Sequence, residues 1–267
     1  MSKLAILGGG NLGRALALGW ARAGLLPAPE IAITRRQAER LSDLGDAGYV
    51  VGSDNRAAVR AAEILLVAVQ PQQLHELAED VAGEIDAGRH RVISVVSGVT
   101  IAQLGEALGS AVPVVRAMPN TAVSIGESMT CLSAAEDAQA ALSQAKELFD
   151  ALGRTLVIPE EMMIPATALC ACGVAFFLRC VRAASQGGIE IGFHPEEALL
   201  MAAQTARGAA SLALQEGAHP EGEIDRVTTP RGCTIAGLNE MEHQGFSSAM
   251  IRGITVSARA AGELYEG

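Results

Sequence analysis

Six residues near the start of the chain have the spacing of a phosphate-binding loop. Gly8-Gly9-Gly10-Asn11-Leu12-Gly13 fits the pattern G-x-G-x-x-G, and it lies between a four-residue apolar run and an amphipathic stretch. Glycines at these places permit a tight turn and let the backbone approach a pyrophosphate at the positive end of a helix. The sequence therefore predicts a dinucleotide-binding loop between a first strand and a first helix.

The end of the second apolar run indicates which dinucleotide is bound. A site for NAD carries Asp or Glu about 20 residues after the loop, where the carboxylate binds the ribose 2′-hydroxyl. This chain instead has Thr34, followed by Arg35 and Arg36. A guanidinium pairs well with a 2′-phosphate, and the Thr34 hydroxyl can add a donor. We therefore expect NADP(H), recognised by Arg35 and Thr34, in preference to NAD.

The positions of tyrosine and lysine exclude two common classes of nicotinamide-dependent dehydrogenase. The chain has only Tyr49 and Tyr265, and neither begins the Tyr-x-x-x-Lys pair of one class. Dehydrogenases of 3-hydroxyacids and 6-phosphogluconate need a lysine in a helical second domain, but the only lysines here are Lys3 and Lys146. A reductase without a strong proton donor suits a protonated imine, whose positive charge already prepares its carbon for hydride.

A turn in the last quarter of the chain is suited to binding an acid group. Pro230-Arg231-Gly232 precedes a helical stretch expected to begin at Thr234. Free backbone N–H groups and the positive end of a helix meet there, which makes a carboxylate receptor that needs no lysine. The Arg231 guanidinium could also clamp a carboxylate through two hydrogen bonds. His194 and His243 are the histidines considered as general acids, and both are expected at the surface.

Taken together, these motifs resemble those of the pyrroline-5-carboxylate reductase family across nearly the whole chain. The glycine loop resembles its G-x-G-N-[ML]-[GA], residues 68–72 its A-V-K-P-Q, and residues 116–121 its R-x-M-P-N-T. Residues 94–101 are similar to its strand-end A-G-[VI]-x-[IL]. Towards the C-terminus, residues 204–210 resemble Q-T-x-x-G-A-A, residues 227–238 resemble V-T-S-P-G-G-T-T-I-x-x-L, and residues 242–246 resemble E-x-x-G-F.

The resemblance implies NADPH-dependent reduction of 1-pyrroline-5-carboxylate to L-proline, the last step of proline biosynthesis. It also implies a homodimer formed by the helical domain, with dimers joining into larger rings. Thr234 would lie nearest the substrate ring nitrogen, as the catalytic residue that holds or relays a proton. The expected substrate contacts are Thr229, Arg231, Gly232, Cys233 and Thr234. The expected cofactor contacts are Gly8, Gly10, Asn11, Leu12, Gly13, Thr34, Arg35, Asn55, Ala68, Val69, Gln70, Pro71, Ser97 and Gly98.

The chain departs from the family pattern around the expected substrate pocket. The family's S-G-S-G-P-A-Y reads C-A-C-G-V-A-F at residues 170–176, and Arg231 and Cys233 stand where the family has Gly and Thr. Gln70 replaces a lysine and Ala122 a proline. Two alternatives therefore stay open. One is reduction of a related cyclic imine acid, such as a piperideine carboxylate or 1-pyrroline-2-carboxylate; the other is a non-catalytic NADP-binding regulatory homologue.

The elements that must position these residues change in character near residue 160. Before it, apolar runs alternate with amphipathic stretches, which is typical of a mostly parallel sheet with helices on both faces. The expected strands are 4–7, 31–34, 64–69, 92–96, 112–116 and 156–158, with helices that include 12–23, 37–44, 101–108 and 135–152. After it, the expected helices are 164–187, 195–216, 220–227, 234–244 and 246–266. We expect an NADP-binding α/β Rossmann domain over residues 1–160 and an all-α dimerisation and substrate domain over 161–267.

Charge and cysteine content indicate where the protein works and with what. A net charge of −10 and a pI near 5.0 predict no nucleic-acid partner and no attraction to an anionic membrane. Five cysteines at irregular spacing predict a reducing, cytoplasmic environment, and Cys170-x-Cys172 without a second pair predicts no metal site. Residues 162–178 lack charge. Because Pro165 interrupts this segment and arginines follow it, we expect a helix buried against a partner subunit rather than a membrane span.

Overall fold

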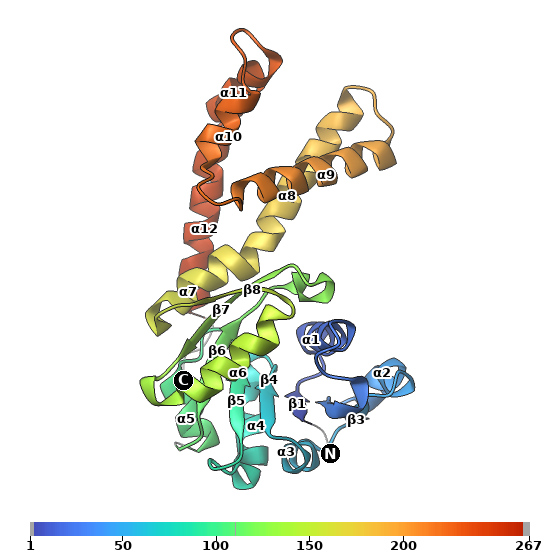
Figure 1. Ribbon diagram of the computed structural model, residues 1–267, viewed down its shortest axis with the longest axis vertical. Coiled ribbons are helices and arrows are strands. Elements are labelled where there is room, and N and C mark those ends of the chain that lie inside the picture. Colours follow the sequence, from blue (N-terminus) through green and yellow to red (C-terminus); the bar gives the residue numbers. More distant parts are fainter. Residues whose placement is uncertain (1–2, 110, 264–267) are drawn as a thin grey trace. The chain divides into compact units, whose positions relative to one another are not determined.

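The chain forms two compact units, one built on a β-sheet and one helical (Figure 1). The computed structural model describes residues 3–109 and 111–263. One unit comprises Met1–Cys172 and Ser257–Gly267, and the other comprises Gly173–Val256. The units thus divide after Cys172, whereas the domain boundary expected at residue 160 stays a prediction.

The first unit has an eight-stranded sheet in the order β3-β2-β1-β4-β5-β6-β7-β8. Its strands are β1 (Leu4–Leu7), β2 (Ile31–Thr34), β3 (Val50–Gly52), β4 (Ile64–Val67), β5 (Arg91–Ser94), β6 (Val114–Met118), β7 (Ser128–Ala134) and β8 (Gly153–Val157). Strands β1 to β6 are parallel, β7 is antiparallel to β6, and β8 is parallel to β7. The expectation of a mostly parallel sheet is confirmed.

Helices cover both faces of this sheet. They are α1 (Asn11–Arg22), α2 (Ser42–Asp46), α3 (Asn55–Ala61), α4 (Leu74–Val81), α5 (Ile101–Leu108) and α6 (Gln139–Asp150). One apolar core joins α1, α2 and α6 to one face of the strands, and a second joins α3, α4 and α5 to the other. Strands β1, β2 and β4 are buried along their whole length, because both of their faces are covered.

The position of α1 is set by the single tryptophan of the chain. The Trp20 Nε1–H donates to the Leu148 carbonyl of α6 at 2.7 Å inside the core. The Trp20 ring also meets the Phe149 ring edge-on, with centroids 5.7 Å apart. Because α1 begins at the glycine loop, this anchor between α1 and α6 also holds that loop against the end of β1.

Two strands, β3 and β7, were not expected from the sequence. β3 has only three residues at the edge of the sheet and is partly exposed. β7 reads SMTCLSA, in which small and polar residues hide the alternation of a strand. Both strands become stable by pairing with a neighbour, which the local sequence does not encode.

The helix expected over residues 164–187 is divided into three pieces. These are α7 (Met163–Ala166), a π-helical segment (Thr167–Cys172) and α8 (Gly173–Glu190). Pro165 lacks an N–H group, and the Thr167 hydroxyl donates to the Met163 carbonyl at 2.8 Å. The Thr167 hydroxyl competes for that carbonyl where the π-helical segment begins, whereas Pro165 lies in the first turn of α7, where a missing N–H group is tolerated.

The second unit is built from long helices. They are α8, α9 (Pro195–Ala213), α10 (Pro220–Val227), α11 (Cys233–His243) and the first part of α12 (Phe246–Gly262). Helices α8 and α9 approach closely, since a Cβ on Gly188 would lie 3.0 Å from that of Ala198. Many large apolar side chains of these helices are exposed in the single chain, including Phe177, Ile191 and Leu200.

One stretch, Glu160–Glu190, is long and apolar enough to cross a membrane by length and composition, with a mean hydropathy of 1.9 over an 18-residue window within it. Little of it is buried within the chain. A helix with this much exposed apolar surface needs another surface to cover it.

Candidate cofactor and substrate site

The glycine loop lies between β1 and α1, where the sequence predicted it. Gly8 has a φ of +122°, and a Cβ there would lie 2.5 Å from the Ala68 carbonyl oxygen. A Cβ on Gly13 would lie 2.1 Å from the Gly8 carbonyl oxygen. The loop therefore packs against the end of β4 and against its own helix so closely that only glycine fits at these two positions.

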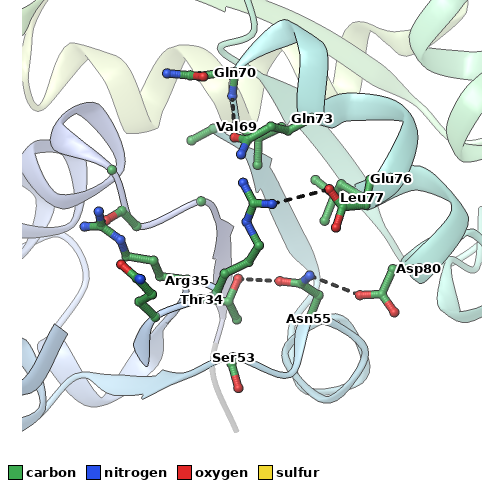
Figure 2. Close-up of a pocket in the computed structure, with 16 residues that line it drawn as sticks. Thr34, Arg35, Ser53, Asn55, Val69, Gln70, Gln73, Glu76, Leu77 and Asp80 are labelled. Atoms are coloured by element: carbon green, nitrogen blue, oxygen red, sulfur yellow. Dashed lines mark hydrogen bonds and ion pairs between the residues drawn. The ribbon is translucent and has the colours of Figure 1, made fainter. Parts of the chain in front are cut away.

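The loop opens on a cavity of about 970 Å³ in the first unit (Figure 2). The residues that line it come from the end of β2, from the segments after β1, β2, β3 and β4, from the start of α3 and from α4. Eight of them were predicted as cofactor contacts: Gly8, Gly10, Thr34, Arg35, Asn55, Ala68, Val69 and Gln70. The others are Gly9, Arg36, Gln37, Ser53, Gln73, Glu76, Leu77 and Asp80.

The remaining predicted contacts lie outside this lining. Asn11, Leu12 and Gly13 form the first turn of α1, and Pro71 follows the lining residue Gln70. Ser97 and Gly98 lie in the loop after β5. Their contact with a cofactor stays a prediction.

A chain of hydrogen bonds runs along one wall of the cavity (Figure 2). The Thr34 hydroxyl donates to Asn55 Oδ1 at 2.7 Å, and Asn55 Nδ2 donates to Asp80 Oδ2 at 3.0 Å. Arg56 Nε in turn donates to Asp80 Oδ1 at 2.9 Å. The Thr34 proton is thus used within the protein, while the orientation of the Asn55 amide is fixed from both sides.

Two arginines supply the positive charge of the cavity. Arg35 Nη1 donates to the Gly9 carbonyl at 3.1 Å, which places its guanidinium beside the glycine loop. Arg36 Nη1 lies 3.6 Å from Glu76 Oε2, and both of these side chains are 71% exposed. The sequence indicated Arg35 as a cofactor contact. Arg36, Glu76 and Asp80 line the cavity together because α4 lies beside the end of β2, and no local sequence pattern predicts that position of α4.

These residues fit a dinucleotide with an extra phosphate. Gly10 is the N-cap of α1, so no cap side chain binds the first-turn N–H groups, and a Cβ at Gly10 would meet nothing within 4 Å. That arrangement accommodates a pyrophosphate. The guanidinium groups of Arg35 and Arg36 at the end of β2 offer cationic partners for a ribose phosphate. Asn55 offers a hydrogen-bonding amide between them and α4.

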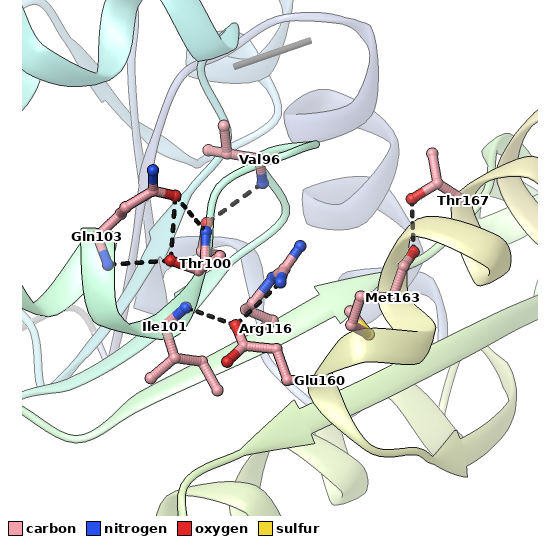
Figure 3. A network of polar contacts seen from close by, with 9 residues as sticks. Val96, Thr100, Ile101, Gln103, Arg116, Glu160, Met163 and Thr167 are labelled. Carbon is pink, nitrogen blue, oxygen red and sulfur yellow. Dashed lines mark hydrogen bonds and ion pairs between the residues drawn. The ribbon is translucent and has the colours of Figure 1, made fainter. Parts of the chain in front are cut away.

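An ion pair with one buried partner holds the next loop along the sheet (Figure 3). Arg116 Nη1 on β6 lies 2.9 Å from Glu160 Oε1, and the Arg116 side chain is only 5% exposed. The same Glu160 oxygen accepts from the Ile101 N–H at 2.6 Å, at the start of α5. Thr100 and Gln103 complete this cap through reciprocal side chain to backbone bonds. Glu160 thereby ties β6 to the loop that carries Ser97 and Gly98, a role that the sequence did not indicate.

The predicted substrate residues form a tight turn in the second unit. The Gly232 N–H donates to the Thr229 carbonyl at 2.9 Å, so Pro230 and Arg231 are the two central residues. Arg231 has a φ of +60°, the only positive value among the non-glycine residues described. Proline first and a positive φ second define a type II turn, which favours glycine at the Arg231 position. Gly232 is also required, because a Cβ there would lie 2.4 Å from Thr229 Oγ1.

Helix α11 begins one residue earlier than expected. Gly232 is its N-cap without a side-chain cap, so Cys233 and Thr234 form the first turn. Cys233 is exposed and Thr234 is half-buried. No side chain caps the N–H groups of this turn, which is compatible with an anion there; that they bind one stays a prediction.

Comparison with known proteins finds a matching family model for each part of the chain. Residues 160–264 match the family described as pyrroline-5-carboxylate reductase dimerisation. Residues 3–98 match the family described as NADP oxidoreductase coenzyme F420-dependent. The first match accounts for the exposed apolar helices of the second unit, and the second agrees with the prediction of an NADP-type cofactor.

Two relatives and one solved structure extend the match to nearly the full chain. Pyrroline-5-carboxylate reductase 1 of Dictyostelium discoideum is 48% identical over 98% of this chain, although the chain spans only 50% of that protein. Pyrroline-5-carboxylate reductase 2 of the same organism is 45% identical over 96% of this chain and 90% of its own length. The crystal structure of Plasmodium falciparum pyrroline carboxylate reductase with NADP bound superposes with a TM-score of 0.90, 22% identity and 98% coverage of both chains. The protein is therefore an NAD(P)-dependent oxidoreductase of the pyrroline-5-carboxylate reductase family.

Proposed function

We propose that this protein reduces 1-pyrroline-5-carboxylate to L-proline with NADPH, as the last step of proline biosynthesis in the cytoplasm. The observation that carries the choice of an imine acid is the uncapped first turn of α11 behind the type II turn at Thr229–Gly232. It offers N–H groups to a carboxylate in a helical unit that contains no lysine. The names of the relatives support the same substrate.

NADPH would supply the hydride. The residues of the chain would bind and orient the cofactor and the substrate and would supply the proton. Gly8, Gly10 and the first turn of α1 would hold the pyrophosphate, and Arg35 would hold the 2′-phosphate. Asn55, fixed between Thr34 and Asp80, would position the adenosine half. Because the protonated imine already carries a positive charge, no strong general acid is needed to make its carbon electrophilic.

The substrate carboxylate would be bound by the turn before α11. The N–H groups of the first turn of α11, from Cys233 onward, would donate to it, and the exposed Arg231 side chain would add a charged contact. The Thr234 hydroxyl, in the first turn of α11, would hold a proton at the ring nitrogen. The turn belongs to the second unit and the cavity to the first.

The helical unit would form a homodimer, and dimers would join into larger rings. The exposed apolar side chains of α8, α9 and α12 support a dimer, since a stable single chain would not leave so many in water. With the apolar side chains of α8 covered in this way, neither a membrane nor a nucleic acid is needed as a partner.

The test is a substrate panel with a matched variant. Purified protein is incubated with NADPH and a five-membered or six-membered cyclic imine acid, and the nicotinamide absorbance is followed. We expect turnover with 1-pyrroline-5-carboxylate and none without an imine. Thr234→Val should lower turnover, whereas Thr255→Val, at an exposed threonine of the same unit, should not. Faster turnover of a piperideine carboxylate or 1-pyrroline-2-carboxylate would reassign the substrate, and binding of NADPH without any turnover would indicate a regulatory protein.

A further inference from the structure

Two cysteines that are far apart in the sequence meet in the first unit. Cys131 lies on β7 and Cys170 lies in the π-helical segment. Their Sγ atoms are 3.9 Å apart, and both thiols are free. Neither cysteine belongs to the cofactor cavity or to the turn at Thr229–Gly232. The residues proposed to bind the cofactor and the substrate thus do not include this pair, although Cys170 begins the stretch 170–176 near the expected substrate pocket.

The surroundings of the pair are apolar, yet one of the two cysteines is partly exposed. Cys131 is 3% exposed and packs in a small core with Met118, Met163 and Ala166. Cys170 lies at the edge of this core and is half-buried. A small oxidant can therefore reach Cys170 first, with Cys131 directly behind it.

The thiol of the partly exposed Cys170 is more acidic than the thiol of the buried Cys131. The contact with Cys131 lowers the pKa of the Cys170 thiol to about 7, against the opposing effect of burial. The contact with Cys170, together with burial, raises the pKa of Cys131 well above its ordinary value. Cys170 is thus the sulfur that carries the thiolate, the nucleophilic form of cysteine.

We propose that Cys131 and Cys170 are an oxidation site that forms a reversible disulfide when the protein meets a hydroperoxide such as hydrogen peroxide. The Cys170 thiolate attacks one peroxide oxygen, the O–O bond breaks, and the released hydroxide takes a proton to become water. The Cys131 sulfur then attacks the resulting sulfenic acid, the S–O bond breaks, and a second water leaves. Two thiols lose two electrons and two protons, and one peroxide becomes two waters.

The geometry permits this step with a limited movement. A disulfide needs its sulfurs at about 2.05 Å, so the gap of 3.9 Å must close by about 2 Å. The π-helical segment is the natural place for this adjustment, because its backbone hydrogen bonding is already irregular. The link would fasten that segment to β7, next to Asn120, whose side-chain amide donates to the Cys170 carbonyl at 3.2 Å.

The experiment maps the thiols of the full-length protein after exposure to hydrogen peroxide. The reduced chain has five thiols. We expect the number that reacts after unfolding to fall by two and to recover with dithiothreitol. Cleavage at arginine and lysine puts Cys131 in residues 117–146 and Cys170 with Cys172 in residues 155–179. These two peptides should appear joined, with a mass two hydrogen atoms below the sum of the reduced pair.

Variants identify which sulfurs are joined. Cys172→Ser should keep the joined peptides, whereas Cys170→Ser should abolish them. In Cys131→Ser the Cys170 sulfenic acid should persist and react with dimedone; Cys131→Ala serves if the serine variant is poorly folded. Joined peptides that disappear in Cys172→Ser would overturn the proposal, and so would a wild-type protein that keeps all five thiols or carries only sulfinic acid at Cys170.

Discussion

Replacing Arg35 by glutamine tests how the protein distinguishes NADPH from NADH. Arg35 Nη1 donates to the Gly9 carbonyl at 3.1 Å, beside the cavity that we assign to the cofactor. Loss of that neutral acceptor contact costs about 0.5–1.5 kcal/mol for either cofactor, because it loosens the same glycine loop. Loss of a charge-assisted bond to the 2′-phosphate costs a further 1.5–3 kcal/mol or so, for NADPH alone.

The expected result is a change in the ratio of two dissociation constants. Since about 1.4 kcal/mol corresponds to a factor of ten, Arg35→Gln should weaken NADPH relative to NADH by roughly 10-fold to 150-fold. Arg36→Gln should have a smaller effect, below about tenfold, because Arg36 must leave Glu76, and such an exposed pair is itself worth about 0–1 kcal/mol. Both effects should shrink as salt concentration rises.

The assay is a fluorescence titration of each variant with NADPH and with NADH. Arg60→Gln is the matched control, because it removes the same charge at an exposed pair with Glu84 outside the cavity. The reasoning is refuted if Arg35→Gln weakens both cofactors equally. A larger selectivity loss in Arg36→Gln than in Arg35→Gln would instead assign the 2′-phosphate to Arg36.

Three further predictions concern the substrate turn, the folded state and the dimer. Arg231→Gly removes the strain of a positive φ and should stabilise the turn by about 1 kcal/mol. If the guanidinium binds the substrate carboxylate, the same change should raise the KM for the imine acid about tenfold. An unchanged KM in steady-state kinetics would show that Arg231 is not part of the site. Burial lowers the pKa of His90, so the unfolded state binds the proton more readily, and stability should be lost as pH falls below about 6.5. Thermal melts between pH 7 and pH 5 should show this loss, and His90→Gln should reduce it. Leu200→Asp places a charge on an exposed apolar face of α9 and should shift the protein towards monomer in sedimentation experiments; an unchanged dimer would mean that this face is not in the interface.

Much of the fold could be predicted because its signals are local. The bounds of β1, β2, α5 and α10 match the expected ranges to the residue. Helix α5 begins at a cap formed by Thr100 and Gln103, and α10 begins at Pro220. Such caps act within one turn of the chain, so they can be read without knowing the tertiary structure.

The sequence by itself determined the glycine loop, the arginine that follows β2 and the turn before α11, since each depends on neighbouring residues. Tertiary structure decided how the cofactor cavity is closed. The order β2-β1-β4 brings α4 beside the end of β2, so that Glu76 faces Arg36 and Asp80 fixes Asn55. The tertiary structure also pairs β7 with β6 and brings the Sγ atoms of Cys131 and Cys170 close together. These contacts join residues that are far apart in the chain, and only the packing of the sheet specifies which of them meet.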